Sequence, residues 1–106
     1  MQFSAALLLA GVCAVVQAET FVGCSSTMVS SASFTSQFMS WGACEDKCKK
    51  EACGSPTAMG ISGEVCHCGK LPDQKDLVDE ALCDTPCPGF GSLKCGGENT
   101  FSIFTI

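Results

Sequence analysis

The segment GEVCHCG, residues 63–69, places one histidine between two cysteines and decides how the rest of the chain folds. Successive residues of an extended strand point to opposite sides, so Cys66 and Cys68 share one side and His67 faces the other. The segment is either the centre of a metal site or one half of a disulfide framework. The spacing of the other cysteines distinguishes these two interpretations.

A second pair of cysteines has a matching spacing. The segment WGACEDKCKKEAC, residues 41–53, follows Ser40, a good helix N-cap residue. It places Cys44 and Cys48 four positions apart on one face of the predicted helix. Four residues along a helix and two along a strand both span about 6 Å. A helix lying on the strand is therefore fastened at two points when each of its cysteines bonds to one cysteine of the strand.

The first 18 residues, MQFSAALLLAGVCAVVQA, have the features of a secretory signal peptide. The apolar run 5–16 is too short to cross a bilayer, which needs about 20 helical residues. Ala18 is the small residue that a signal-peptidase site needs. We therefore expect residues 19–106 to form a single secreted domain, extracellular or associated with a cell wall. A small domain so rich in cysteine is typical of a disulfide scaffold.

The net charge of −5 narrows the range of partners. An acidic surface repels phosphate groups, which argues against nucleic acid and anionic membranes as partners. No apolar run after residue 18 is long enough to span a membrane, so we expect no membrane span in the mature chain. We therefore expect the partners of the mature chain to be extracellular.

Local patterns predict a small disulfide-rich α+β fold, with one or two short helices packed on a small antiparallel sheet. A second helix is predicted for residues 73–82, where Leu77, Val78, Ala81 and Leu82 share a face. The Ser-rich segment 25–36 is predicted to be an ordered loop, and segment 84–97 has loop chemistry throughout. Strands are predicted at 20–23, 57–61, 64–68 and 100–103.

Six short motifs carry a resemblance to a known family. They are GC at 23–24, MSWGAC at 39–44, CEDKC at 44–48, CHCG at 66–69, CDTPC at 83–87 and KCGG at 94–97. In this order they resemble the WSC domain, the cysteine-rich module of fungal cell-wall stress sensors and secreted fungal proteins. The resemblance covers residues 20–106 and implies a compact helix-and-sheet fold with four disulfides. The implied pairs are Cys24–Cys83, Cys44–Cys66, Cys48–Cys68 and Cys87–Cys95.

Cys53 has no partner in that pattern. We expect it to carry a free thiol. A link to a second chain, which makes a dimer, and a reshuffling of the neighbouring disulfides are the alternatives.

Catalysis and metal binding find little support in the sequence. A zinc site needs four thiolate or imidazole ligands, and disulfides compete for the same sulfurs in a secreted chain. A nucleophile needs an oriented base, and His67 is the only histidine. The acidic pairs Asp76 with Glu80 and Asp79 with Asp84 are more simply explained as a solvated surface. The sequence predicts no enzyme, no metal and no cofactor.

The resemblance implies a function in binding. WSC domains are regarded as carbohydrate-binding modules, so it implies non-catalytic binding of fungal cell-wall polysaccharide, glucan-like in type. Sugar rings stack on exposed aromatic side chains, and polar groups hold their hydroxyls. The candidate ligand-binding residues are Trp41, His67, Lys70, Phe90 and Asn99.

Each candidate has a structural alternative, and the chain departs from the family pattern. Family members usually carry an aromatic residue or an amide at three positions that hold Ser25, His67 and Lys70 here, and the chain has no tyrosine. Trp41 suits half-buried packing, and Asn99 suits a turn. A second hypothesis therefore stands: a small secreted protein of effector or inhibitor type that binds another extracellular protein on the same scaffold.

Overall fold

The structure, a computed structural model, describes residues 19–51 and 56–106. The predicted signal peptide and Cys53 lie outside the described residues. No helix within the described ranges is long and apolar enough to cross a membrane.

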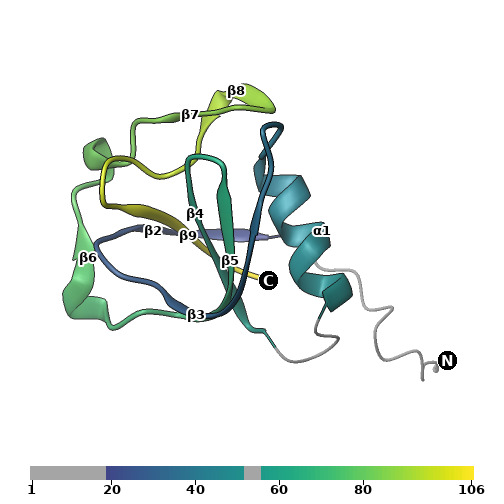
Figure 1. Cartoon of the computed structure of the whole chain (residues 1–106). Helices are drawn as coiled ribbons and strands as arrows, with labels where there is room; N and C mark the ends of the chain where they lie inside the picture. The colour runs from purple at the N-terminus through teal and green to yellow at the C-terminus, as the bar shows by residue number, and fades with distance from the viewer. Residues whose placement is uncertain (1–18, 52–55) are drawn as a thin grey trace, which may run out of the picture.

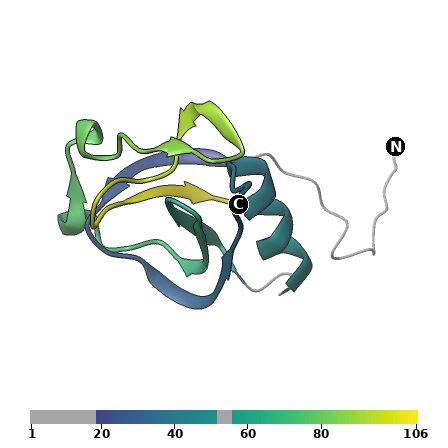
Figure 2. The ribbon, with the colours of Figure 1, turned by 45° about the horizontal axis from the view of Figure 1, so that its top comes forward.

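One α-helix packs against a six-stranded antiparallel sheet, which agrees with the expected fold class (Figure 1). The strand order is β3-β5-β4-β9-β2-β6, and a separate two-stranded sheet, β7-β8, lies at one end of the molecule. Helix α1 covers one side of the large sheet near β4 and β5 (Figure 2). The bounds are β2 Thr20–Ser25, β3 Val29–Thr35, α1 Trp41–Glu51, β4 Ala58–Ser62, β5 Val65–Lys70, β6 Leu77–Val78, β7 Pro86–Cys87, β8 Phe90–Lys94 and β9 Phe101–Thr105.

Helix α1 begins where the sequence predicts. The Oγ atom of Ser40 accepts a hydrogen bond from the N–H of Ala43 at 3.1 Å, which satisfies one of the free amides of the first turn. Met39 precedes the cap and is buried together with Cys44. This apolar pair before and after the cap fixes the direction from which the chain enters the helix.

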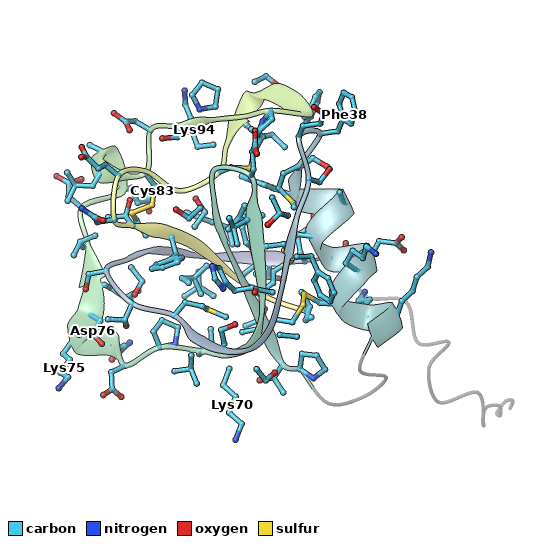
Figure 3. The ribbon with its side chains drawn as sticks, viewed as in Figure 1. Phe38, Lys70, Lys75, Asp76, Cys83 and Lys94 are labelled. Atoms are coloured by element: carbon cyan, nitrogen blue, oxygen red, sulfur yellow. A yellow bond between two sulfur atoms is a disulfide. The ribbon has the colours of Figure 1, made fainter. Side chains whose placement is uncertain are left out.

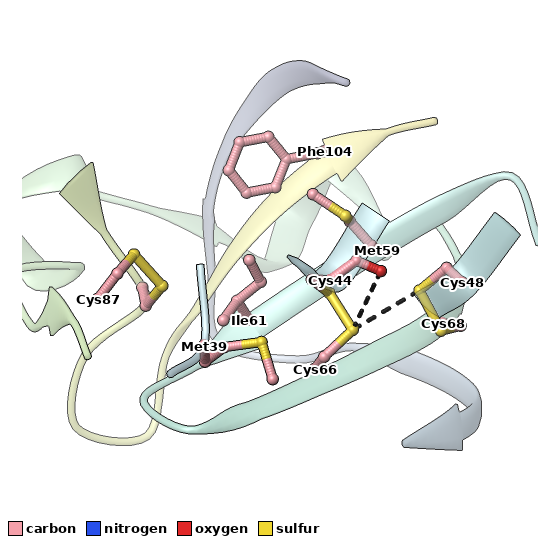
Figure 4. Close-up of a cluster of buried hydrophobic side chains, with 10 residues drawn as sticks. Met39, Cys44, Cys48, Met59, Ile61, Cys66, Cys68, Cys87 and Phe104 are labelled. Atoms are coloured by element: carbon pink, nitrogen blue, oxygen red, sulfur yellow. Dashed lines mark hydrogen bonds between the residues drawn. A yellow bond between two sulfur atoms is a disulfide. The ribbon is translucent and has the colours of Figure 1, made fainter. Parts of the chain in front are cut away.

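Two disulfides join α1 to β5. Cys44 bonds to Cys66 and Cys48 bonds to Cys68, each pair with a Cα–Cα distance of 5.4 Å. All four residues are at most 1 % exposed. The helix is therefore fastened to the strand at two points, as the cysteine spacing predicts. Met39, Met59, Ile61 and Phe104 pack around these sulfurs and complete the core (Figure 4).

The other two disulfides hold the segments that the large sheet does not include. Cys24 of β2 bonds to Cys83, 59 residues later, and Cys87 bonds to Cys95 across the β7-β8 hairpin. The four bridges are the four that the family resemblance implies. Every cysteine in the described ranges is paired.

The Ser-rich segment 25–36 is not a loop, and the prediction there is wrong. It contains β3, whose residues Ala32 and Phe34 pair with Cys68 and Cys66 of β5. These two side chains are half-buried, and the neighbouring side chains Ser33 and Thr35 are exposed. Small polar residues on the exposed side concealed the period of two that marks a strand.

The prediction of a helix for residues 73–82 is also wrong. The structure has two short 3-10 turns, Gln74–Asp76 and Glu80–Leu82, on either side of β6. Strand β6 pairs with the edge of β2, where Cys24 faces Val78. This pairing and the disulfide to Cys83 favour an extended chain over the local helical pattern.

Segment 84–97 contains regular structure where only a loop is predicted. Strands β7 and β8 form a hairpin in which Pro86 faces Lys94 and Cys87 faces Phe90. The disulfide between Cys87 and Cys95 closes it. Covalent closure allows two very short strands to pair outside the main sheet.

The ends of the described domain meet in the centre of the sheet. Thr20 of β2 and Thr105 of β9 are partners in the antiparallel register. Strand β9 also pairs with β4, where Met59 faces Phe104. The last strand therefore joins the first strand to the rest of the sheet.

Candidate functional site

The β7-β8 hairpin rests on the chain that leads into α1. The N–H of Gly89 donates a hydrogen bond to the carbonyl oxygen of Met39 at 2.8 Å. Position 89 requires glycine, because a Cβ atom there would collide with the carbonyl oxygen of Phe38. Together with the Cys87–Cys95 disulfide, this contact holds the hairpin against residues 38–39.

Four exposed side chains lie at this junction and along β8. Phe90 is 55 % exposed and Phe38 is 70 % exposed. Ser92 and Lys94 are also exposed, whereas Leu93 packs toward the core. We define the β8 surface as Phe38, Phe90, Ser92 and Lys94. It offers two apolar rings, a hydroxyl and an ammonium group, which suits a ligand with both apolar and hydroxyl groups.

Phe38 was not among the sequence-derived candidates. A signal for it exists: Phe38 and Met39 are two consecutive apolar residues before the Ser40 cap. Only the residue directly before the cap takes the buried position beside the helix. Met39 occupies that position at 2 % exposure, which leaves Phe38 in solvent.

Trp41 is a packing residue next to the β8 surface. Its ring centroid lies 4.6 Å from that of the buried Phe104 and 6.1 Å from that of Phe21. Its Nε1–H donates a hydrogen bond to the carbonyl oxygen of Lys94 at 2.8 Å. The structure therefore gives Trp41 the half-buried role that was its structural alternative.

His67 lies on the side of the sheet opposite to its cysteine neighbours. The ring is half-buried, with its centroid 5.4 Å from that of Phe101 in an edge-to-face contact. Its Nδ1 atom lies 3.3 Å from the Oγ atom of Ser30. Burial lowers the pKa of His67 below its usual value of 6.5, because desolvation disfavours the charged imidazolium.

Lys70 ends β5, where it faces Val29 in the register with β3. It borders a shallow pocket of about 230 Å³ at this edge of the sheet. Figure 3 places Lys70 at the end of the molecule opposite to Phe38 and Lys94. The pocket is lined by Val29, Ser30, Ser31, Pro56, Gly69 and Lys70.

Asn99 serves a turn. Its φ of 60° lies in the left-handed region, which asparagine tolerates better than most residues. The turn is closed by paired backbone hydrogen bonds between Gly97 and Thr100. The structure thus does not bring the five candidates together: Trp41 and Phe90 lie near β8, His67 and Lys70 lie near Ser30, and Asn99 lies in the turn.

The sulfur cluster in the core has the spacing of a metal site but different chemistry. The Sγ atoms of Cys44, Cys48 and Cys66 lie within 4.8 Å of one another. All three atoms are bonded in disulfides, so none is the thiolate that zinc binds.

Comparison with known proteins agrees with this architecture. The family model of the WSC domain matches residues 21–97. The cell wall integrity and stress response component 1 of Schizosaccharomyces pombe is 37 % identical over 60 residues, which are 54 % of this chain and 16 % of that protein.

A second relative, described as an uncharacterized protein in LEU2 3'region of Pichia angusta, is 28 % identical over 85 residues. The match covers 80 % of this chain and 22 % of that protein. The chain therefore spans less than a quarter of the length of either relative. With the family match over most of its length and all four implied disulfides in place, the chain belongs to the WSC domain family.

Proposed function

We propose that this domain binds a fungal cell-wall polysaccharide, glucan-like in type, without chemical conversion, through the β8 surface. Membership of the WSC family and the similarity to a cell wall integrity component support a role related to the cell wall. The proposal includes secretion of the mature domain, with residues 1–18 as the signal peptide.

The observation that carries the proposal is the exposure of two phenylalanine rings on a surface that is fixed from several directions. Phe38 and Phe90 are 70 % and 55 % exposed. The Cys87–Cys95 disulfide and the hydrogen bond from Gly89 to Met39 restrict the backbone beneath them. A rigid apolar surface loses little entropy when a sugar ring stacks on it. Ser92 and Lys94, which are exposed on the same strand as Phe90, add donors for sugar hydroxyls.

A purely binding role also agrees with the surroundings of the only histidine. The His67 ring contacts Phe101 and Ser30, and the Oγ atom of Ser30 donates to the carbonyl oxygen of Ala32. Within the described ranges, no carboxylate is hydrogen-bonded to the imidazole. A hydrolytic triad needs such a group to orient the base. We therefore propose that the domain is not an enzyme and needs no cofactor.

Sedimentation with insoluble polysaccharides tests the proposal. Oxidised protein is mixed with particulate β-glucan, chitin or mannan, and the bound fraction is measured after centrifugation. We expect retention on β-glucan, with at least a fivefold loss for Phe90→Ala and for Phe38→Ala. Leu82→Ala is the matched control, because Leu82 is 53 % exposed but lies outside the β8 surface. Equal retention of all three variants contradicts the proposed site.

A second function, binding of an extracellular protein, is favoured by one observation. The aromatic side chains of the β8 surface are both phenylalanine, which lacks a polar atom for sugar hydroxyls, and the chain has no tyrosine. Exposed phenylalanine also suits the apolar centre of a protein interface. Absence of retention on all three polysaccharides, with the disulfides intact, favours this function over the first.

A further inference from the structure

We infer that Trp41 is a positioning residue for the β8 surface: it holds the end of β8 in place and does not contact the ligand. This inference rests on the proposed binding role of that surface, and it assigns to Trp41 a function different from the stacking platform that its residue type suggests.

Two hydrogen bonds connect the β7-β8 hairpin to Met39 and Trp41, just before and at the start of α1. Near the tip of the hairpin, the N–H of Gly89 donates to the carbonyl oxygen of Met39 at 2.8 Å. At the other end of β8, the indole Nε1–H of Trp41 donates to the carbonyl oxygen of Lys94, also at 2.8 Å. Met39 and Trp41 therefore hold the chain just before β8 and at its last residue. Figure 3 shows Phe38 and Lys94 at this same end of the molecule.

The bond from Trp41 is the shorter of the two side-chain contacts that fix this end of β8. The Lys94 carbonyl oxygen also accepts from the Oγ atom of Ser102, at 3.3 Å. Ser102 is 1 % exposed and belongs to β9. The carbonyl is thus held between the helix and the central sheet, and this fixes the direction in which the Lys94 side chain leaves the strand.

The indole itself is oriented by the core. Its ring packs edge-to-face against Phe104, which is 0 % exposed, and runs parallel to the ring of Phe21. Its only polar hydrogen is used by the protein. An indole with its donor engaged and its ring packed against two neighbours has little left to offer a sugar, so its effect on binding passes through β8.

Amide hydrogen exchange tests the positioning role directly. Trp41→Phe keeps an aromatic ring and removes the donor. We expect the amides of Gly89 and Cys95 to exchange about two- to tenfold faster, the size expected for one lost hydrogen bond. The Ser26 amide, which donates to the carbonyl oxygen of Asp76 directly before β6, should be unchanged.

Phe21→Leu is the matched control, since it removes the parallel ring and keeps the hydrogen bond. Faster exchange at all three amides in Trp41→Phe indicates a general loss of stability and overturns the inference. Exchange equal to that of the wild type at Gly89 and Cys95 overturns it as well.

Fluorescence separates positioning from direct contact, because Trp41 is the only tryptophan in the chain. Acrylamide quenching is measured with and without a soluble β-1,3-glucan. Positioning predicts unchanged quenching together with reduced glucan retention for Trp41→Phe. Protection of the indole by the glucan overturns the inference. If wild-type protein binds no polysaccharide, the proposed function fails, and the exchange measurement still decides whether Trp41 positions β8.

Discussion

The Sγ atom of Cys66 lies 3.7 Å from the Sγ atom of Cys48, so the two disulfides between α1 and β5 are in van der Waals contact (Figure 4). The same Sγ atom of Cys66 lies 3.5 Å from the carbonyl oxygen of Cys44. The bridges therefore act as core packing as well as covalent links. In a domain of this size, sulfur fills the place that larger aliphatic side chains occupy elsewhere.

Removal of a single disulfide should destabilise the domain more, the longer the loop that the disulfide closes. The chain-entropy relation gives a loss of about 4 kcal/mol for Cys24–Cys83, about 3 kcal/mol for Cys44–Cys66 and about 2.5 kcal/mol for Cys87–Cys95. Their sequence separations are 59, 22 and 8. Paired Cys→Ala variants and urea unfolding measure this. A largest loss at Cys44–Cys66 instead shows that packing of the touching sulfurs outweighs loop closure.

Removal of the helix cap should cost about 1 kcal/mol of unfolding free energy in Ser40→Ala, because the N–H of Ala43 loses its acceptor. Ser33→Ala is the control, since Ser33 is an exposed strand residue outside α1. Denaturant titration of both variants is the measurement. An equal and negligible effect of the two substitutions contradicts the capping role.

Two glycines of the β7-β8 hairpin should respond differently to alanine. Gly89→Ala brings a Cβ atom against the Phe38 carbonyl, so the hairpin must move and retention on β-glucan should fall. Gly91→Ala has nothing within 4 Å of the new atom and should bind as the wild type does. Sedimentation of the two variants side by side gives the answer. Normal binding by Gly89→Ala means that the position of the hairpin does not matter for binding.

Stability should fall as the pH drops below about 6.5, with His67 as one cause. Its folded pKa lies below the usual 6.5, so the unfolded chain takes up the proton first. The contribution of His67 is fully present above pH 6.5 and is lost as the pH falls through that value toward the folded pKa. Thermal melting at pH 7.5 and 5.5 measures the change, and His67→Gln should show a smaller one. An identical change in His67→Gln assigns the effect to other groups.

Cys53 should supply one free thiol per mature chain. Residues 19–106 hold nine cysteines, and the four disulfides use eight of them. Thiol titration of denatured, unreduced protein counts the ninth. No thiol together with a dimer on a non-reducing gel supports the alternative, a link between two chains.

The covalent centre of the fold was predictable from the sequence, because covalent geometry is local. The spacing of Cys44 and Cys48 on a helix matches the spacing of Cys66 and Cys68 on a strand, and the structure has this arrangement. The side of β5 on which His67 lies follows from the alternation of side chains along a strand. These inferences needed only the rise per residue of each element and the alternation of side chains along a strand.

Pairing between distant segments was not predictable in this way. Strand β3 is stabilised by β5, more than 30 residues later, and β6 by β2, about 50 residues earlier. Local propensity alone therefore predicts a loop for the first and a helix for the second. Phe38 was missed for a related reason: the hairpin that makes its exposed ring part of a surface, through the close approach of Gly89 to the Phe38 carbonyl, lies about 50 residues along the chain.

The register partnership of Thr20 with Thr105 has a consequence for architecture. Directly opposite residues of antiparallel strands have Cα atoms about 5 Å apart, so the domain receives and releases the polypeptide at nearly one point. Inserted into a longer polypeptide, such a module projects to one side of the chain. It adds almost nothing to the distance between the segments that precede and follow it. Permuted versions, with these ends joined by a short linker and new ends opened at the Ser62–Gly63 turn, should keep the same crosslinks.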